Sequence, residues 1–325
     1  MRILLSKQAA VELTPRITAL LEPYPFQIFF AEDCQSGDDI EVAFISRDVT
    51  GLSTKQVVQP STQHFYQLLL NAPSLSWVHT HSAGSDRPIF AQLREKNIAV
   101  TTSNGVNAEI VVQSALAAIL SLARHFPAMQ RAQQARQWES LIKHLPADLR
   151  GQTAVLVGWG AIAQRLAFFL HHLGVRCIAL RFSEATHSSE IAKFLSINTI
   201  DTVLATADWL ILACPLTAQT RCLIDAQRLA RLPRHARLIN VARGEVVDEN
   251  ALIDALENKH LAGAYLDVFT TEPLATASPL WHLENVIVTP HSAGHAAGNE
   301  ARVLELFLSN LERKQRNDTL LNLVP

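Results

Sequence analysis

One short stretch limits the fold of this chain more than any other: Val155-Leu-Val-Gly158-Trp-Gly160-Ala-Ile-Ala163. The apolar run Ala154–Val157 predicts a strand, and the residues through His172 predict a helix. Glycines between a strand and a helix are typical of a dinucleotide-binding turn. One makes the tight turn, and the next lets the backbone approach a pyrophosphate at the positive end of the helix. The candidate cofactor contacts in this stretch are Gly158, Trp159, Gly160, Ala161 and Ile162.

Strand and helix signals alternate along the chain, which predicts parallel sheets with crossover helices. In the first hundred residues, short apolar runs predict strands at Ile3–Leu5, Gln27–Phe30, Glu41–Ile45, Trp77–Thr80 and Ala99–Thr101. Helical patterns between them cover Val11–Leu21, Gln63–Leu70 and Ile89–Lys96. Later strands are predicted at Arg176–Leu180, Trp209–Ala213, Arg237–Val241, Gly263–Leu266 and Val286–Thr289, with a helix at Asp248–Asn258 and an irregular crossover over 184–208.

Longer helical patterns lie outside this alternation. Residues Asn107–Arg124 predict a long helix rich in alanine and leucine, and Ala296–Lys314 predict a final helix that packs back on the first domain. Residues 128–148 continue as a second amphipathic segment, with apolar side chains at helical spacing. Core packing or a subunit contact explains that apolar face most simply. The side chains concerned are those of Trp138, Leu141, Ile142 and Leu145.

The composition is that of an ordinary globular protein and argues against several classes of function. Of the 325 residues, 48% are hydrophobic and 18% are charged, and the net charge of −2 offers no basic surface for nucleic acid or an anionic membrane. The four cysteines have no metal-ligand spacing. No uncharged stretch is long enough to span a bilayer, and the first residues predict a strand, not a signal peptide. We therefore expect a cytoplasmic protein with neither nucleic acid nor a membrane as partner.

Three motifs in the second half of the chain carry side chains suited to acid–base chemistry. They are Asn240-Val-Ala-Arg243-Gly244, Glu272-Pro273 and Thr289-Pro-His291-Ser-Ala-Gly294. Arg243 is a permanently charged fork that fits a carboxylate and polarises a neighbouring carbonyl. His291 exchanges a proton near neutral pH, and Glu272 is suited to orient its imidazole. Taken singly, each also has an ordinary interpretation, as a surface charge, a loop histidine or a strand-end glutamate. All the proposed site residues follow predicted parallel strands, where open α/β sheets bind ligands.

The end of the strand Arg176–Leu180 bears on the choice of cofactor. Roughly 20 residues after the glycines, an NAD-selective fold places an acid that accepts hydrogen bonds from the ribose 2′-OH. This chain has Arg181-Phe182-Ser183 there, and no acid before Glu184. A guanidinium matches a 2′-phosphate, and Ser183 adds a hydroxyl donor. We therefore predict that NADP is the preferred cofactor, with NAD as the alternative. A solvent-facing arginine stacked on adenine would suit either.

The turn after the strand Trp77–Thr80 reads His79-Thr-His81-Ser-Ala83-Gly84-Ser-Asp86. His79 and His81 lie on the same face of the strand end, because side chains alternate along a strand. Either could touch a substrate, although a packed or hydrogen-bonded histidine is the simpler interpretation of both. No metal site is predicted, since neither a carboxylate nor a cysteine stands directly beside them.

The ordered combination of glycine turn, Asn-Val-Ala-Arg-Gly, Glu-Pro and Thr-Pro-His resembles the D-isomer-specific 2-hydroxyacid dehydrogenase family, which includes glyoxylate/hydroxypyruvate reductases. The resemblance covers nearly the full length and is strongest from Leu149 to Gly294. It implies an α/β fold of two parallel-sheet domains, Rossmann-like and flavodoxin-like, with a cleft between them. Residues 1–103 plus 295–325 would form a discontinuous substrate-binding domain, and residues 104–294 the dinucleotide-binding domain. A homodimer is also implied.

The same resemblance implies roles for individual residues. Backbone amides of Ala83 and Gly84 would hold the substrate carboxylate, because a turn with small side chains lets N–H groups approach an anion. Asp267 would meet the nicotinamide carboxamide. The sequence departs from the family at Val112-Gln113-Ser114, where Ala-Glu-His is usual. The remaining implied cofactor contacts are Cys214, Pro215, Thr217, Val241, Ala242, Ala293 and Gly294.

The implied reaction is reversible hydride transfer between NAD(P)H and a small 2-oxo acid of the glyoxylate or hydroxypyruvate type, giving a D-2-hydroxy acid. Protonated His291 would donate to the carbonyl oxygen, and Glu272 would hold the imidazolium. Arg243 would bridge the carboxylate and the carbonyl oxygen, so that Arg243 and His291 both contact substrate. The alternative is a dinucleotide-sensing binding protein, like the transcriptional corepressors that share this fold. The lack of low-complexity segments or basic runs argues against that alternative.

Overall fold

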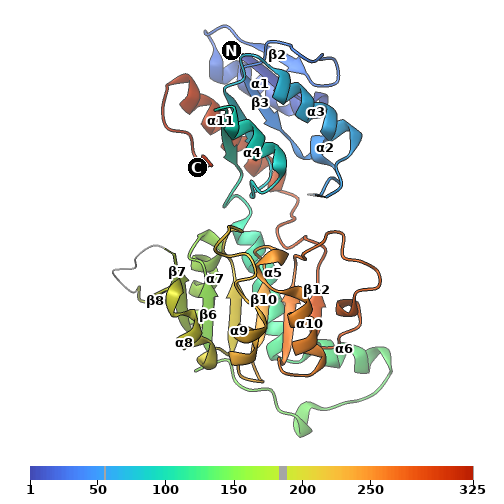
Figure 1. Cartoon of the computed structure of the whole chain (residues 1–325). Helices are drawn as coiled ribbons and strands as arrows, with labels where there is room; N and C mark the ends of the chain where they lie inside the picture. The colour runs from blue at the N-terminus through green and yellow to red at the C-terminus, as the bar shows by residue number, and fades with distance from the viewer. Residues whose placement is uncertain (55, 183–188, 325) are drawn as a thin grey trace. The chain divides into compact units, whose positions relative to one another are not determined.

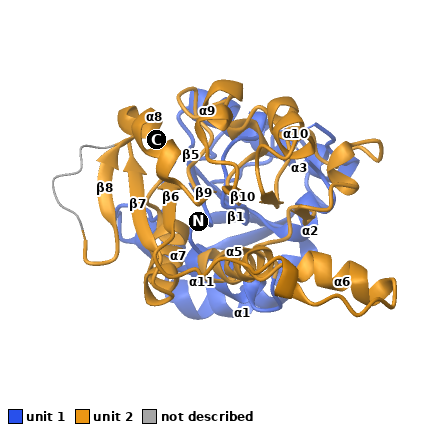
Figure 2. Cartoon of the chain, turned by 90° about the horizontal axis from the view of Figure 1, so that it is seen from below, with its two compact units in different colours: residues 1–106, 296–325 blue, residues 107–295 orange. Residues whose placement is uncertain are grey.

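The computed structural model describes residues 1–54, 56–182 and 189–324, and it divides the chain into two compact units (Figures 1 and 2). Unit 1 comprises Met1–Val106 and Ala296–Pro325, and unit 2 comprises Asn107–His295. Within the described ranges, each unit contains one parallel sheet, of five strands in unit 1 and seven in unit 2. The fold is therefore α/β with two parallel-sheet domains, as the sequence predicts. The assignment of substrate to one unit and dinucleotide to the other stays a prediction at this point.

The sheet of unit 1 has the order β2-β1-β3-β4-β5. Because side chains alternate along a strand, its residues contribute to two separate cores. Ile3, Phe44 and Trp77 pack with helices α1 and α11, whereas Leu4, Ala43 and Val78 pack with α3 and α4. The elements are β1 (Arg2–Leu5), α1 (Lys7–Leu21), β2 (Gln27–Phe30), β3 (Val42–Ile45), α2 (Arg47–Thr50), α3 (Pro60–Asn71), β4 (Trp77–Thr80), α4 (Pro88–Glu95), β5 (Ala99–Thr102) and α11 (Asn299–Gln315).

The C-terminal segment packs on the strands of unit 1 and completes its fold. The Phe307 ring of α11 stacks on Phe44 and on Trp77, with ring centroids 4.8 and 5.6 Å apart. After α11, the last described residues run antiparallel to the edge strand β5, and the Val324 amide donates to the Val100 carbonyl oxygen at 2.8 Å. This pairing covers backbone groups that an edge strand would otherwise leave open.

The sheet of unit 2 has the order β12-β11-β10-β9-β6-β7-β8. Val155 and Val157 pack with α8, α9 and α10, while Ala154 and Leu156 pack with α5 and α7, so helices cover both faces. The strand order reverses between β6 and β9, which is where a doubly wound sheet binds a dinucleotide. The strands are β6 (Thr153–Val157), β7 (Arg176–Arg181), β8 (Lys193–Ser196), β9 (Trp209–Leu212), β10 (Arg237–Asn240), β11 (Gly263–Leu266) and β12 (Val286–Val288).

The helices of unit 2 vary widely in length. The α-helices are α5 (Ala108–Ala123), α6 (Phe126–Gln134), α7 (Ala161–His172), α8 (Ile200–Val203), α9 (Ala226–Arg231) and α10 (Glu249–Glu257). Short 3-10 turns are η1 (Leu141–Lys143), η2 (Ile197–Thr199), η3 (Leu204–Thr206), η4 (Gly244–Val246) and η5 (Pro279–Trp281). No single described helix is long and apolar enough to cross a membrane, and α5 with α6 meets that criterion only as a pair bent by 71°.

The prediction of a continuous amphipathic segment over 128–148 was wrong. Helix α6 ends at Gln134, Arg136 adopts a left-handed φ of 56°, and only the short turn η1 follows. Trp138 is 100% exposed, and Ile142 and Leu145 are 79% and 77% exposed. Most helical stability comes from packing of an apolar face, and within unit 2 this face packs on no core. Of the two explanations given for it, core packing is therefore excluded.

A second difference lies in the segment predicted as an irregular crossover. Lys193–Ser196 forms the edge strand β8, which pairs in parallel with β7. The strand is short, and its side chains are only half-buried or exposed, so its sequence lacks the unbroken apolar character of the buried strands.

Candidate active site

The glycine turn after β6 has the geometry that a close backbone approach requires. Gly158 has a φ of +96°, and a Cβ there would lie 2.9 Å from the Ala213 carbonyl oxygen, so only glycine fits. Gly160 is the N-cap of α7, and a Cβ there would meet no heavy atom within 4 Å. The described residues thus leave room beside the first amides of α7, which have no partner within the helix. This turn fits a dinucleotide pyrophosphate.

Arg181, the last residue of β7, lies over an aromatic ring. Its guanidinium carbon is 5.3 Å from the centroid of the Phe194 ring, and Trp159 of the glycine turn meets the same ring edge-on at 5.0 Å. This contact holds the half-buried guanidinium beside the glycine turn by a cation–π attraction. Ser183, the predicted partner of Arg181, lies outside the described residues. Sequence reasoning missed Phe194, because it assigned no strand to that segment.

His291 and Glu272 form a hydrogen-bonded pair. The distance from His291 Nδ1 to Glu272 Oε2 is 2.8 Å, and Glu272 Oε1 accepts from the Phe269 amide at 3.1 Å. Burial acts to raise the pKa of Glu272, but the hydrogen bond and charge of His291, the Phe269 amide and the charge of Arg243 outweigh it, so the pKa lies below its ordinary value. Glu272 is therefore a carboxylate near neutral pH. With Nδ1 committed to it, Nε2 is the ring nitrogen suited to exchange a proton with a ligand.

Asp267, at the end of β11, anchors the loop that carries His291. Its Oδ1 accepts from Thr289 Oγ1 at 2.5 Å and from the amides of Ser292 and Ala293 at 2.7 and 2.9 Å. Its backbone carbonyl accepts from the His291 amide at 2.8 Å. His291 has a φ of +49°, a left-handed conformation that costs a non-glycine residue roughly 1–3 kcal/mol. The four hydrogen bonds to Asp267 hold that conformation in place.

This environment also shifts the pKa of the Asp267 carboxyl group. Burial raises its pKa, and the donated hydrogen bonds from Thr289, Ser292 and Ala293 only partly offset that effect. Sequence reasoning placed Asp267 at the nicotinamide carboxamide and missed its role as an anchor. The contact with a nicotinamide stays a prediction.

Helix α5 also supports the loop that carries His291. Ser114 Oγ donates to the Ala293 carbonyl oxygen at 2.8 Å, and a Cβ on Gly294 would lie 3.2 Å from Val111 Cγ2. Ser114 belongs to the segment in which the sequence departs from the family pattern, so a serine hydroxyl here helps to fix the end of the His291 loop.

Arg243 follows β10 and is held by a buried asparagine. The Asn240 side chain donates to the Arg243 carbonyl oxygen and accepts from the Ala242 amide, both at 3.0 Å. The half-buried guanidinium donates from Nη1 to the Ala242 carbonyl oxygen at 2.7 Å, and its charge helps to lower the pKa of Glu272. Asn240 belongs to the sequence motif that carries Arg243, but its supporting role was not predicted. A buried asparagine at a strand end, three residues before the arginine, was the signal.

Gly244 locks this strand end to the loop that carries Glu272. A Cβ on Gly244 would lie 1.9 Å from the Phe269 carbonyl carbon, so the two backbones touch where only glycine fits. On the far side of the loop, Glu249 Oε2 accepts from the Thr270 amide at 2.9 Å. The position of Glu272 relative to Arg243 is therefore fixed by direct backbone contact.

The remaining predicted cofactor residues lie along the same edge of the unit 2 sheet. Cys214 and Pro215 follow β9, and burial raises the pKa of the Cys214 thiol to about 11, so it is a neutral wall. The Thr220 hydroxyl bridges the Thr217 amide and the Pro215 carbonyl oxygen, at 2.7 Å from each, and fixes the turn. Val241 and Ala242, after β10, are buried.

In unit 1, the turn after β4 has the features of an anion site. The carbonyls of Ser82 and Gly84 accept from the Ser103 amide at 2.9 Å and from Ser82 Oγ at 3.0 Å. The amides of Ala83 and Gly84, in contrast, donate to no acceptor among the described residues. Unpaired backbone N–H groups in a turn are suited to bind a carboxylate. The histidines are hydrogen-bonded, and His81 Nε2 lies 2.8 Å from Thr50 Oγ1.

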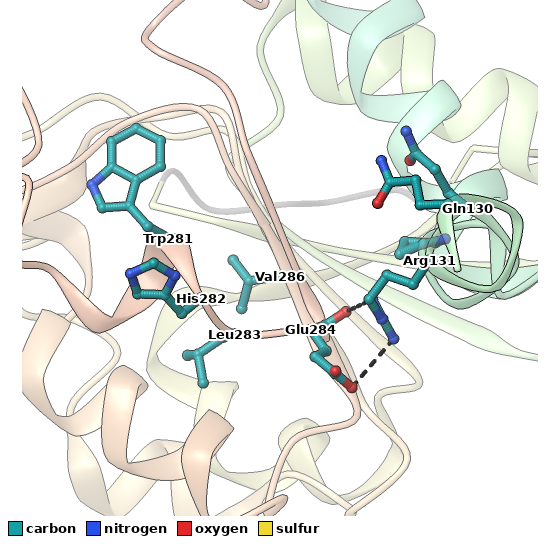
Figure 3. A pocket seen from close by; sticks show the side chains of 9 residues that line it. Gln130, Arg131, Trp281, His282, Leu283, Glu284 and Val286 are labelled. Carbon is teal, nitrogen blue, oxygen red and sulfur yellow. Dashed lines mark hydrogen bonds and ion pairs between the residues drawn. The ribbon is translucent and has the colours of Figure 1, made fainter. Parts of the chain in front are cut away.

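Unit 2 also contains a pocket of about 280 Å³ away from these strand ends (Figure 3). Its one arginine is already paired, since Arg131 Nη1 donates to the Glu284 carbonyl oxygen at 2.9 Å and Nη2 lies 3.4 Å from Oε2. Val286 begins β12, whereas His291 follows the other end of that strand. The pocket is therefore separate from the proposed catalytic residues. Its lining consists of Pro127, Gln130, Arg131, Gln134, Trp281, His282, Leu283, Glu284 and Val286.

Comparisons with known proteins agree with this geometry. A family model described as D-isomer specific 2-hydroxyacid dehydrogenase, NAD binding domain, matches residues 116–293. The chain is 32% identical over 263 residues to a glyoxylate reductase of Pyrococcus horikoshii, covering 78% of each sequence. It is 36% identical over 238 residues to glyoxylate/hydroxypyruvate reductase B of Yersinia pestis, covering 72% of each. A D-isomer specific 2-hydroxyacid dehydrogenase from Xanthobacter autotrophicus, solved in complex with NADPH and MES, is similar over 100% of this chain and 97% of its own, with 28% identity and a TM-score of 0.77.

Two glycines with opposite surroundings provide a matched test of the site's construction. We expect Gly244→Ala to lower the free energy of unfolding by roughly 1–3 kcal/mol, because the methyl group collides with the Phe269 backbone. Gly160→Ala has open space at its Cβ, so it should lower the free energy of unfolding by less than about 1 kcal/mol, the cost of alanine at a helix N-cap. Urea denaturation of both variants measures the difference. Equal stabilities would contradict the described contact between the two loops.

Proposed function

Because this chain belongs to the D-isomer-specific 2-hydroxyacid dehydrogenase family, we propose that it reduces a small 2-oxo acid of the glyoxylate or hydroxypyruvate type to the D-2-hydroxy acid. The chain is an NAD(P)-dependent oxidoreductase, and its glycine turn fits the cofactor. The observation that carries the proposal is the 2.8 Å pair of His291 and Glu272 on the sheet edge that also carries Arg243. The relatives named above support the substrate class.

In the proposed reaction, the bound nicotinamide cofactor supplies the hydride. His291 supplies the proton to the carbonyl oxygen of the substrate, from Nε2. Glu272 holds the imidazole through Nδ1 and stabilises its protonated form, which is the form that can donate. The carbonyl group thereby gains one hydride at carbon and one proton at oxygen and becomes a secondary alcohol or, from glyoxylate, a primary one.

The substrate carboxylate needs fixed donors, which two parts of the chain supply in this proposal. Arg243 pairs with the carboxylate and polarises the carbonyl oxygen, because a planar guanidinium presents two parallel N–H groups. In unit 1, the amides of Ala83 and Gly84 are suited to bind a carboxylate, and their lack of an acceptor among the described residues supports that role. Fixed donors limit a bound substrate to a reactive orientation.

Turnover against a panel of 2-oxo acids tests this function directly. With NADPH, the absorbance at 340 nm should fall in the presence of glyoxylate or hydroxypyruvate, and the product should be the hydroxy acid. Tight NADPH binding without turnover of any 2-oxo acid would contradict the proposal and would favour a dinucleotide-sensing protein instead.

The pairing of His291 with Glu272 predicts a shift in pH dependence. The lowered pKa of Glu272 keeps the carboxylate charged at and above its ordinary pKa, and the pair is lost only as the pH falls through the lowered value. In Glu272→Gln, the protonated imidazole loses its charged acceptor, so oxo-acid reduction should decline at lower pH than in the wild type as the pH is raised. The measurement is kcat/KM between about pH 5 and pH 9. Superimposable profiles would show that Glu272 does not act on His291.

We further infer that NADPH is the preferred cofactor. Support comes from Arg181, which the Phe194 ring holds at the end of β7 where an NAD-selective fold has an acid. A guanidinium that pairs with the 2′-phosphate contributes about 1.5–3 kcal/mol, which corresponds to a roughly ten- to hundredfold preference.

Reversal of the charge at Arg181 tests this inference. Arg181→Asp should lower kcat/KM for NADPH by at least about tenfold and leave NADH use similar or improved, because the carboxylate repels a phosphate and accepts from a 2′-hydroxyl. Arg176→Asp, at the exposed amino end of the same strand, is the matched control and should change neither value. A wild type that already prefers NADH would contradict the inference.

We also infer that the chain forms a homodimer through the arm, defined as residues 126–148. The exposed side chains of Trp138, Ile142 and Leu145 support this, because such a patch of large apolar groups marks an interaction surface. Light scattering should give a dimer for the wild type and a monomer for Trp138→Ser/Ile142→Ser. Val11→Ser, which removes an exposed apolar residue from unit 1, should remain dimeric. A monomeric wild type would contradict the inference.

A cytoplasmic location is also inferred, on the chemistry of the cysteines. All four carry free thiols, and Cys177 and Cys214 are buried. Free thiols are kept reduced in the cytosol, whereas oxidising compartments favour disulfides.

A further inference from the structure

Unit 1 contains a buried histidine that the proposed chemistry does not use. His79, in β4, is completely buried, and its ring lies against those of Phe44 and Phe307, with centroids 5.8 Å away in each case. Burial, with a smaller effect from His81, lowers the pKa of His79 to about 3. The imidazole is therefore neutral near physiological pH, so one ring nitrogen carries a hydrogen and the other accepts one.

The contacts at Nε2 show which nitrogen carries the hydrogen. Ser103 Oγ lies 3.2 Å from His79 Nε2 and donates to the Thr80 carbonyl oxygen at 3.0 Å. A carbonyl only accepts, so the single hydroxyl hydrogen of Ser103 points at Thr80. The hydroxyl then has only a lone pair for His79. Nε2 is accordingly the protonated nitrogen and the donor.

The contacts at Nδ1 agree with this assignment. Trp77 Nε1 donates to Thr101 Oγ1 at 2.8 Å, and the same hydroxyl lies 2.7 Å from His79 Nδ1. An indole N–H never accepts, so Thr101 accepts from Trp77 and has its own hydrogen left for Nδ1. The hydrogen bonds therefore form a chain in which each group donates to the next, in the order Trp77, Thr101, His79, Ser103 and Thr80. All five residues are buried.

This directed chain ends at the turn whose amides form the anion site. Besides its bond to Thr80, Ser103 donates from its amide to the Ser82 carbonyl oxygen at 2.9 Å. Ser82 Oγ in turn donates to the Gly84 carbonyl oxygen at 3.0 Å. The carbonyls of residues 80, 82 and 84 are therefore all engaged, while the amides of Ala83 and Gly84 donate to no described residue. A carbonyl shares its peptide plane with the amide of the next residue, so the bond to the Ser82 carbonyl fixes the direction of the Ala83 amide. The Gly84 amide follows in the same turn, which is held again at the Gly84 carbonyl.

We propose that His79 is a positioning residue for the substrate-binding turn at 81–84. Its two ring nitrogens contact the hydroxyls of Thr101 and Ser103, and Thr101 in turn accepts from the buried Trp77 side chain. Ser103 then holds the turn by hydrogen bonds to the carbonyl oxygens of Thr80 and Ser82. The proposal deepens the function proposed above and rests on it, because it takes the amides of Ala83 and Gly84 to hold the carboxylate of a 2-oxo acid. His79 acts on that carboxylate only through the turn.

The test is steady-state kinetics of His79→Phe and His79→Gln with glyoxylate and NADPH. Phenylalanine keeps an aromatic ring against Phe44 and Phe307 but removes the two hydrogen bonds that the His79 ring makes with the hydroxyls of Thr101 and Ser103. We expect it to raise the KM for glyoxylate about tenfold, the equivalent of about one lost hydrogen bond. The kcat should change less than about twofold, and the KM for NADPH should not change. Glutamine retains a donor and an acceptor, so His79→Gln should lie between the wild type and His79→Phe.

A control variant separates positioning from general support of the core. Asn310 is equally buried in unit 1, and its side chain bonds the backbone of Leu321 at 3.0 and 2.7 Å. Asn310→Leu should lower the melting temperature without changing the KM for glyoxylate. If the melting temperature of His79→Phe falls by a similar amount while its KM for glyoxylate stays at the wild-type value, the inference is overturned.

Two further outcomes are decisive. If His79→Phe does not fold, Ser103→Ala removes the same link with a smaller change, and an unchanged KM in that variant also overturns the inference. A wild type that reduces no 2-oxo acid contradicts the proposed function, and with it this inference. An active wild type with an unaffected His79→Phe overturns only the role of His79, so the two failures are distinct.

Discussion

The proposed active site depends on one buried carboxylate, that of Asp267. Its Oδ1 accepts three hydrogen bonds from the loop after β12, and its backbone carbonyl accepts one from the His291 amide. These bonds stabilise the left-handed backbone of His291, whose φ of +49° is unfavourable for a residue other than glycine. The loop in turn determines where the imidazole meets Glu272. A group that the sequence suggests as a cofactor contact is, in the structure, the support of the loop that carries His291.

The rest of the site is held by backbone contact more than by side chains. Gly244 lies directly against Phe269, and Gly158 lies directly against the Ala213–Cys214 backbone, at positions that any side chain would block. These two contacts bring separate strand ends together on one edge of the unit 2 sheet. In unit 1, we propose that the hydrogen bonds through His79 position the turn at 81–84. Fixed donors are effective because they do not have to reorganise during the reaction.

The sequence predicted those parts of the molecule that depend on local patterns. The glycine turn, the buried parallel strands and the α/β fold follow from periodicity and from glycine chemistry, and the motifs around Arg243, Glu272 and His291 follow from strand ends. The pairing of Glu272 with His291 was suggested by the chemistry of the two side chains and by the family resemblance, whereas its geometry comes from the structure. Long-range contacts were not predictable: strand β8 is too short and too exposed to have a signal, and with it Phe194 was missed. The part of the arm after α6, residues 135–148, shows the opposite error. Apolar side chains at helical spacing predicted a continuing helical segment, but they do not form one where there is no core to pack against.

The central claim is that His291, held by Glu272, supplies the proton, and His291→Gln tests it most directly. The measurement is kcat for reduction of glyoxylate together with the Kd for NADPH, with the exposed His282→Gln as the matched control. We predict a fall in kcat of about 10²–10⁴-fold, as expected for loss of a general acid, with the Kd for NADPH unchanged and the control fully active. A His291→Gln variant that keeps more than half of the wild-type kcat would contradict the account.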